Sequence, residues 1–434
     1  MEQRFRAGVV ADDITGANDI GLMFSQGGLS AAVVSLKDQP REEDFADAGV
    51  WIVNTDSRLD SPELAAQKSA AAARFLRDAG CRMVYTKTCS VFRGNVGASF
   101  DAVQDVLGVR CSMVAAGFPE NGRTTVDGLH YVYGVLLENS AFASDPVNPM
   151  HLSRLSDIIG RQSSRPCGAF DRRLLDLPPA QRQERFERLK RSCAYIVFDV
   201  RHQRDLQTIA ALVKDERNLC GSSALARELP AAWGLAGSSE SLLRFDGAGA
   251  GILVVAGSLT PQTFAQVENL KRRGMPCWAV DPMLLFDAGQ RQAHLAQGRE
   301  TLGRYLRAGE DALAYALRNE EQAKARGREL GMSDAQVGRM ISSAFHDLSR
   351  WARRECGVNR FAVAGGETSS AVSAGLGVRS MRIWQEIEPG VPLMTARCED
   401  SSELMLVLKS GSFGSDGFLS NAVQLMRRAS EGHP

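Results

Sequence analysis

Short apolar runs of strand length recur along the chain, and most are followed by a polar turn and a helical pattern. Runs of this length without strict alternation are typical of parallel strands that are buried on both faces. Strands that alternate with helices in this way indicate parallel sheets covered by helices. We therefore predict an α/β fold with strands at Val9–Ala11, Ala31–Leu36, Val50–Val53, Met83–Lys87, Ser112–Ala116, Tyr195–Val200, Ile252–Ala256, Phe361–Ala364 and Leu404–Leu408.

The chain is long enough for two domains, because 434 residues exceed what one hydrophobic core usually serves. A segment between about 231 and 251 is rich in Gly, Ala and Ser, a composition typical of a connection between domains. After it, the pattern of strand, turn and helix begins again. We predict a first domain at 1–235, a linker at 236–250 and a second domain at 251–434, each a mainly parallel sheet flanked by helices.

Helices are also indicated by their start signals and by longer patterns. The region from about 290 to 356 carries helical patterns, 181–191 reads as one exposed helix, and 129–192 as a whole is less regular. N-cap residues precede helical segments at three places, namely Ser61 before Pro62, Thr260 before Pro261, and a capping box of Ser333 with Gln336.

The composition excludes several classes of protein. Lys plus Arg and Asp plus Glu number 51 each, so no overall field would attract a nucleic acid or an anionic membrane surface. Nine cysteines without a CxxC pair indicate reduced thiols in a cytosolic enzyme, rather than a disulfide framework or a zinc site. No export signal or apolar run of about 20 residues is visible, so we expect a cytoplasmic protein, and a homo-oligomer stays open.

Two adjacent carboxylates, Asp12 and Asp13, follow the first predicted strand and precede a Thr-Gly turn into a helix. In open α/β sheets, ligands bind at the carboxyl ends of the strands. Carboxylates there can hold a cation, accept a proton from a sugar hydroxyl, or cap the helix. Capping alone explains one of them, so the residues leave these roles open.

The first half also offers three arginines, Arg58, Arg93 and Arg123, each predicted on a loop that follows a strand. A guanidinium group suits bidentate capture of a carboxylate. Together with Asp12 and Asp13 they predict a pocket for a small hydroxy acid. The same loops supply hydroxyl, amide and glycine candidates for substrate binding, namely Ser57, Ser90, Gly94 and Asn95.

Three predicted strand-end loops in the second half place glycine beside hydroxyl residues, at Gly257–Ser258, Gly365–Ser369 and Lys409–Gly414. Backbone N–H groups and a helix dipole make such turns favourable for phosphate. We predict a nucleotide site, with Lys409 as a mobile charge directed at phosphate, although no Walker, GxGxxG or protein-kinase motif is present. Glu367 would fit a metal that bridges the phosphates, or a ribose hydroxyl. The candidate nucleotide-binding residues are Ser258, Thr263, Gly365, Gly366, Glu367, Thr368, Lys409 and Gly411.

In this order and over nearly the whole chain, the motifs resemble those of the four-carbon acid sugar kinases. They are Ala11–Ala17, Ser90–Gly97, Gly122–Thr125, Gly257–Ser258, Gly365–Ser369 and Lys409–Gly414. The resemblance implies that the first domain binds the acid sugar, the second binds ATP, and the active site lies in the cleft between them. It implies phosphorylation of the terminal hydroxyl of threonate, erythronate or 3-oxo-tetronate. It also implies that Asp12 and Arg93 contact substrate, and that Ser258, Gly365–Thr368 and Gly411 contact ATP.

The chain departs from this family inside the predicted sugar pocket. Many members read Lys-x-Asp-Ser-Thr-Leu-Arg-Gly-Asn, whereas this chain has Cys89 for the acid and Val91 for the hydroxyl residue. Asp127 stands where Asn is commoner. These changes bear on the identity of the substrate more than on the reaction.

As a hypothesis, Arg93 holds the carboxylate of the substrate with help from Arg58 or Arg123, and the C4 hydroxyl faces Asp12 or Asp13. ATP brings Mg²⁺, whose protein ligands the sequence does not identify, and phosphoryl transfer then needs mainly positioning and charge neutralisation. Two alternatives remain. A non-catalytic, two-lobed sensor of a sugar acid or nucleotide would release no ADP, and a metal-dependent sugar-acid aldolase or lyase would turn over without ATP.

Overall fold

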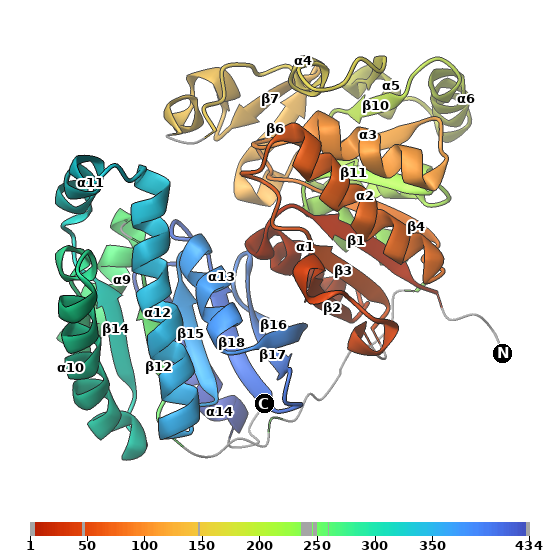
Figure 1. Cartoon of the computed structure of the whole chain (residues 1–434). Helices are drawn as coiled ribbons and strands as arrows, with labels where there is room; N and C mark the ends of the chain where they lie inside the picture. The colour runs from red at the N-terminus through yellow and green to blue at the C-terminus, as the bar shows by residue number, and fades with distance from the viewer. Residues whose placement is uncertain are drawn as a thin grey trace. The chain divides into compact units, whose positions relative to one another are not determined.

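The computed structural model describes residues 5–45, 48–145, 148–235, 245, 250–258 and 260–430. Contacts divide the chain into two compact units, Met1–Ser241 and Leu242–Pro434. The predicted linker, 236–250, lies outside the described residues except at positions 245 and 250. Figure 1 shows both units as sheets with helices packed against them, which confirms the predicted α/β class.

The first unit is built on eight parallel strands in the order β2-β3-β1-β4-β11-β5-β10-β9. Every residue of β1, β3 and β4 is buried, as expected for strands covered on both faces. These strands are β1 Ala7–Ala11, β2 Ala31–Ser35, β3 Val50–Asn54, β4 Met83–Lys87, β5 Ser112–Ala115, β9 Cys167–Phe170, β10 Tyr195–Phe198 and β11 Asn218–Gly221. The helices are α1 Ile14–Gln26, α2 Pro62–Asp78, α3 Val96–Leu107, α4 Leu155–Gly160, α5 Arg172–Leu175, α6 Pro179–Lys190, α7 Gln203–Val213 and α8 Leu229–Ala232.

A separate antiparallel sheet of three strands, β6 Arg123–Val126, β7 Leu129–Val132 and β8 Val135–Leu136, interrupts this pattern. The prediction that Arg123 lies on a loop is therefore wrong, because Arg123 begins β6 and pairs with Val132. Thr124, Thr125 and Val126 are β-branched, and such residues suit a pleated strand once a partner strand is present.

The second unit has strands in the order β13-β14-β12-β15-β18-β17-β16. The first five are parallel, and β17 runs antiparallel to both of its neighbours. The strands are β12 Leu253–Ala256, β13 Cys277–Val280, β14 Ala312–Ala316, β15 Arg360–Ala364, β16 Val378–Glu388, β17 Val391–Cys398 and β18 Glu403–Lys409. The helices are α9 Pro261–Arg272, α10 Ala288–Arg307, α11 Glu320–Glu329, α12 Asp334–Cys356, α13 Gly366–Gly375 and α14 Phe418–Ser430.

Helices cover both faces of the second sheet. Helices α9 and α14 pack on Val254, Ala362 and Val407 in one hydrophobic core. Helices α10, α12 and α13 lie in front of the sheet in Figure 1 and contact its strands from that side. Because β12, β15 and β18 are parallel neighbours, the three predicted phosphate loops, which follow them, share one edge.

The helix starts were predicted correctly. Ser61 and Thr260 cap α2 and α9 ahead of a proline, and Ser333 and Gln336 form the capping box of α12. No helix in the described ranges has both the length and the apolar character needed to cross a membrane.

Candidate active site

Asp12, Asp13 and Arg58 form a compact ion cluster where β1 and β3 end. The guanidinium group of Arg58 donates to both oxygens of Asp12, at 2.9 and 2.7 Å, and to Asp13 Oδ2 at 2.6 Å. The Arg58 side chain is only 17% exposed. Its three nitrogens are therefore engaged by the chain's own carboxylates, which leaves little capacity for the predicted contact with a substrate carboxylate.

The two aspartates differ in what holds them. Asp13 caps α1, because its Oδ1 accepts from the Gly16 amide at 2.8 Å and its Oδ2 accepts from the Thr15 hydroxyl at 2.7 Å. Burial opposes ionisation of Asp13, but Arg58 and Lys87 outweigh it, and the pKa of Asp13 is lowered. Burial raises the pKa of Asp12 above its ordinary value despite Arg58. Asp12 is thus the better proton acceptor of the pair.

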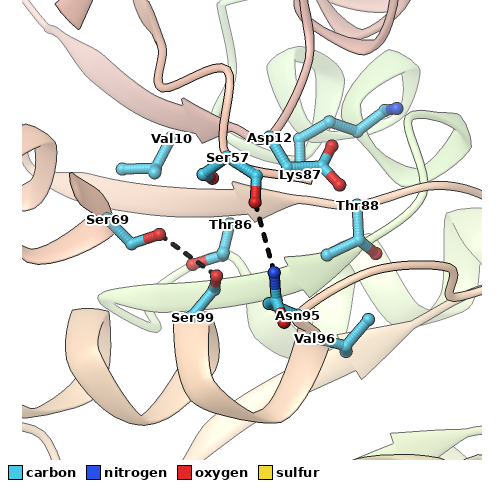
Figure 2. Close-up of a pocket in the computed structure, with 10 residues that line it drawn as sticks. All are labelled: Val10, Asp12, Ser57, Ser69, Thr86, Lys87, Thr88, Asn95, Val96 and Ser99. Carbon is cyan, nitrogen blue, oxygen red and sulfur yellow. Dashed lines mark hydrogen bonds between the residues drawn. The ribbon is translucent and has the colours of Figure 1, made fainter. Parts of the chain in front are cut away.

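A small polar cavity lies below Asp12, and Figure 2 shows its lining. Asn95 ties the loops around it together, since its amide donates to the carbonyls of Ser57 and Asp60 at 3.2 and 2.8 Å. The cavity is lined by Val10, Asp12, Ser57, Ser69, Thr86, Lys87, Thr88, Asn95, Val96 and Ser99.

Lys87, which the sequence did not single out as a site residue, is a buried cation at the end of β4. Its Nζ lies 3.3 Å from Asp19 Oδ2, and the side chain is 4% exposed. The sequence could have indicated Lys87 as a site residue, because it is a charged residue at the end of a buried parallel strand, where ligands bind in such sheets. Lys87 and Arg58 are two cations that face the carboxylates at this edge.

Arg93 and Arg123 converge on one aromatic ring. Their guanidinium carbons lie 5.4 and 5.9 Å from the centre of the Phe142 ring, and Arg123 also lies 4.9 Å from that of Tyr133. Arg93 donates to Asp145 at 2.7 Å, whereas Arg123 donates to the carbonyl of Asn121. The Nε of Arg123 is buried without a partner among the described residues. Two of the three predicted arginines therefore lie over one ring, with Arg93 paired to Asp145 and the buried Nε of Arg123 without a partner among the described residues.

The loop that carries Arg93 lies against the loop that carries Arg58. Gly94 has φ +92°, and a Cβ there would lie 3.0 Å from Arg58 Cγ, so only glycine fits. Ser90 is partly exposed and makes no side-chain hydrogen bond to a described residue. The fold thus brings together the substrate-binding candidates of this loop and the loop after β3.

Cys89 lies 3.4 Å from Arg93 Nε. Burial opposes ionisation of the thiol, but Arg93 and Arg58 outweigh it and lower the pKa of Cys89. Burial raises the pKa of Cys167, also partly exposed, to about 11. At pH 7 we therefore expect iodoacetamide to modify Cys89 several-fold faster than Cys167. Peptide mass spectrometry over time measures both rates, and Cys167 reacting as fast as Cys89 would contradict the prediction.

In the second unit, the loop after β18 is held by three hydrogen bonds to one carbonyl oxygen. Gly411 O accepts from Thr260 Oγ1 at 2.7 Å, Thr263 Oγ1 at 2.8 Å and Lys409 Nζ at 3.2 Å. A Cβ on Gly411 would lie 2.2 Å from Ser258 Oγ, so this loop also packs tightly against the loop after β12. These bonds fix the Gly411–Ser412 peptide with its carbonyl directed inward.

This geometry corrects two of the predicted nucleotide contacts. Lys409 is 1% exposed and Thr263 is 0% exposed, so neither side chain can reach a bound phosphate. Lys409 was predicted to be a mobile charge, but its ammonium group is fixed on Thr263 Oγ1 and on the carbonyls of Ser410 and Gly411. The sequence placed Lys409 at a loop, whereas it is the last, inward-facing residue of β18.

The loop after β15 has the geometry expected of a phosphate site. Gly365 has φ +126°, and a Cβ there would lie 2.9 Å from Thr368 Oγ1 and 3.1 Å from the Ser258 amide nitrogen. Helix α13 begins at Gly366, and Gly366 and Glu367 are exposed. The first turn of α13, with the N–H groups typical of a helix start, therefore lies beside the other two loops.

The buried ammonium of Lys409 predicts a dependence of stability on pH. Burial lowers the pKa of Lys409 from 10.5 to about 8. Between these values the unfolded chain binds a proton that the folded chain does not, so this group makes the free energy of unfolding rise with pH. Relative to Lys409→Met, the wild type should gain on the order of 1–2 kcal/mol between pH 7.5 and 9.5 in urea unfolding. A constant difference between the two proteins would refute this.

Comparison with known proteins agrees with the division into two units. Residues 7–229 match the family model of a sugar-binding N-terminal domain, and residues 253–419 match that of a nucleotide-binding C-terminal domain. The chain is 34% identical over 427 residues to a 3-oxo-tetronate kinase of Pseudomonas fluorescens, with 96% of each chain covered. A 3-oxo-tetronate kinase of Burkholderia multivorans is 33% identical over 96% of this chain and 97% of the relative.

Solved structures show the same architecture. A protein from Salmonella typhimurium LT2, provisionally described as a tRNA synthase, has a TM-score of 0.82 at 27% identity, over 96% of this chain and 98% of the other. The protein HI1011 from Haemophilus influenzae has a TM-score of 0.77 at 27% identity, over 96% and 99%. The domain models and the relatives together show that the chain belongs to the four-carbon acid sugar kinase family and is a phosphotransferase with an alcohol group as acceptor.

Proposed function

We propose that this chain transfers the γ-phosphoryl group of ATP to the terminal C4 hydroxyl of 3-oxo-tetronate, threonate or erythronate. The names of the relatives favour the 3-oxo acid among these substrates. The single observation that carries the proposal is the state of Asp12. It is a buried carboxylate with a raised pKa at a strand end, inside the unit that matches a sugar-binding model.

In this proposal Arg93 and Arg123 bind the substrate carboxylate, and Asp12 accepts the proton of the C4 hydroxyl. The two guanidinium groups lie over the same ring, and the free Nε of Arg123 is a donor without a partner among the described residues. Arg58 acts through Asp12, because it holds both carboxylate oxygens and thereby fixes their direction. Ser57 and Asn95 line the cavity beside Asp12, and Ser90 lies three residues before Arg93 on the same loop.

The phosphates of ATP bind to the amides at the start of α13 and to the loops that contain Ser258 and Gly411. The inward carbonyl of Gly411 turns the N–H of Ser412 outward, because the C=O and N–H groups of one trans peptide point in opposite directions. Mg²⁺ that arrives with ATP needs only one or two protein carboxylates, and Glu367 at the exposed start of α13 fits that role. Among the described residues, no group of three or more Asp, Glu, His or Cys side chains has an arrangement that could hold a metal ion.

A coupled assay of ADP release tests the proposal. It screens D- and L-threonate, D- and L-erythronate and the 3-oxo acids with ATP and Mg²⁺. We expect ADP only when one of these acids is present, and a product whose phosphorus couples to the C4 protons in NMR.

The same screen separates the alternatives. A sensor would show a ligand-dependent rise in melting temperature without ADP, and a lyase would consume the acid without ATP. Either result would overturn the proposed reaction.

A further inference from the structure

Phe264 is a large apolar side chain that stays exposed near the start of α9 in the second unit. Its exposed fraction is 37%. Residues four positions apart lie near one face of a helix, so Thr260 and Phe264 share a side at the start of α9, whereas Thr263 faces the loop after β18. The Thr260 hydroxyl holds the Gly411 carbonyl, so Phe264 lies one helical turn along α9 from the predicted phosphate site.

A cation covers part of this ring from the neighbouring strand. The guanidinium carbon of Arg318 lies 4.8 Å from the centre of the Phe264 ring. Arg318 follows β14, which pairs in parallel with β12, so its loop ends at the same edge as Gly257 and Ser258. An aromatic face and a guanidinium group therefore flank the glycine loops on the β14 side.

The opposite flank of the loops carries a negative charge instead. Glu388, at the end of β16, accepts from the Ser415 amide at 2.6 Å and from the Ser415 hydroxyl at 2.8 Å. An anionic nucleotide is repelled on that flank and attracted on the flank of Arg318. The aromatic ring and the guanidinium group thus lie on the β14 flank, and the Glu388 carboxylate lies on the other flank.

We propose that Phe264 and Arg318 form the nucleobase platform of the phosphoryl donor, on which a purine base stacks while the phosphates occupy the glycine loops. This inference rests on the proposed function, which has the second unit bind ATP. Planar bases stack on aromatic rings and guanidinium groups whatever hydrogen-bonding groups the base carries. The ligand class is therefore a nucleoside triphosphate, whose base is adenine in the proposed donor ATP, and the platform adds affinity for this base rather than for the phosphates.

The test compares ATP with inorganic tripolyphosphate, which keeps the phosphates but has no base. Both are titrated by calorimetry into the full chain as wild type, Phe264→Ala, Phe264→Trp and Arg318→Ala. Leu330→Ala is the matched control, because Leu330 is also an exposed apolar side chain of this unit, at 50%. We expect Phe264→Ala to weaken ATP binding about tenfold, from the usual size of base stacking, and to leave tripolyphosphate within about twofold. Phe264→Trp and Leu330→Ala should bind ATP as the wild type does.

Each other outcome overturns the platform. Unchanged ATP affinity in Phe264→Ala would show that the ring does not touch the base. Equal weakening of both ligands in Arg318→Ala would make Arg318 a phosphate ligand instead. A wild type that binds tripolyphosphate as tightly as ATP would exclude a base site while leaving a phosphate site, whereas a wild type that binds neither ligand would overturn the proposed function as well.

Discussion

Asp12→Asn should lower kcat by about 100-fold or more, while KM for ATP changes by no more than about threefold. The amide has the shape of the carboxylate but cannot accept the proton of the substrate hydroxyl. The phosphate loops belong to the other unit, so nucleotide binding has no reason to change. Steady-state ADP release with saturating acid sugar measures kcat, and full activity in this variant would exclude Asp12 as the base.

Asp13→Asn is the matched control, since Asp13 has the same chemistry one residue away. Its main contacts are the Gly16 amide, the Thr15 hydroxyl and Arg58, which are structural. We expect it to lower the melting temperature and to reduce kcat far less than Asp12→Asn does.

The pH profile of kcat/KM distinguishes the two aspartates in a second way. Because burial raises the pKa of Asp12, the wild-type kcat/KM should fall on the acid side at a higher pH than an ordinary aspartate would cause, and Asp12→Asn should lose this dependence.

The parallel strands could be predicted from sequence because burial on both faces makes them continuous apolar runs. Val9–Ala11, Met83–Lys87 and Phe361–Ala364 lie within or coincide with β1, β4 and β15. Strand β14 was missed, because Ala-Leu-Ala-Tyr-Ala consists largely of helix formers and becomes a strand only between β12 and β13. The β16–β17 hairpin was missed because exposed residues interrupt the apolar pattern of β16, and Pro392, Thr395 and Arg397 interrupt that of β17.

The sequence predicted which residue types form the candidate site. It did not predict which partner each residue contacts. The sequence showed three arginines and two aspartates at strand ends, yet Arg58 alone binds both carboxylates, and Arg93 and Arg123 pair over Phe142. Residue 142 lies in the region read as irregular, so that ring could not be anticipated. The inward direction of the Lys409 side chain could not be predicted either, because the face to which a side chain at a strand end points depends on the register of the strand.

Arg58→Met should destabilise the first unit by about 3–5 kcal/mol at pH 7, the usual cost of removing one partner from a buried ion cluster. The substitution leaves Asp12 and Asp13, whose side chains are 12% and 20% exposed, as adjacent negative charges without their shared cation. Hydrogen exchange at the amides of β3, followed as a function of urea concentration, reports on this unit. Arg82→Met is the control, because Arg82 is 62% exposed and its ion pair with Asp215 is long at 3.4 Å. It should change the free energy of unfolding by no more than about 0.5 kcal/mol.

The destabilisation by Arg58→Met should also depend on pH. In the wild type the pKa of Asp13 is lowered, so that carboxylate stabilises the fold above its unfolded pKa and loses this contribution as pH falls through the lower value. Without Arg58, burial and mutual repulsion raise both pKa values, so protonation relieves the repulsion at mildly acidic pH. The difference between variant and wild type should therefore shrink from pH 7 to pH 5. A difference that stays constant would mean that packing of the Arg58 stem, and not its charge, supports this end of the sheet.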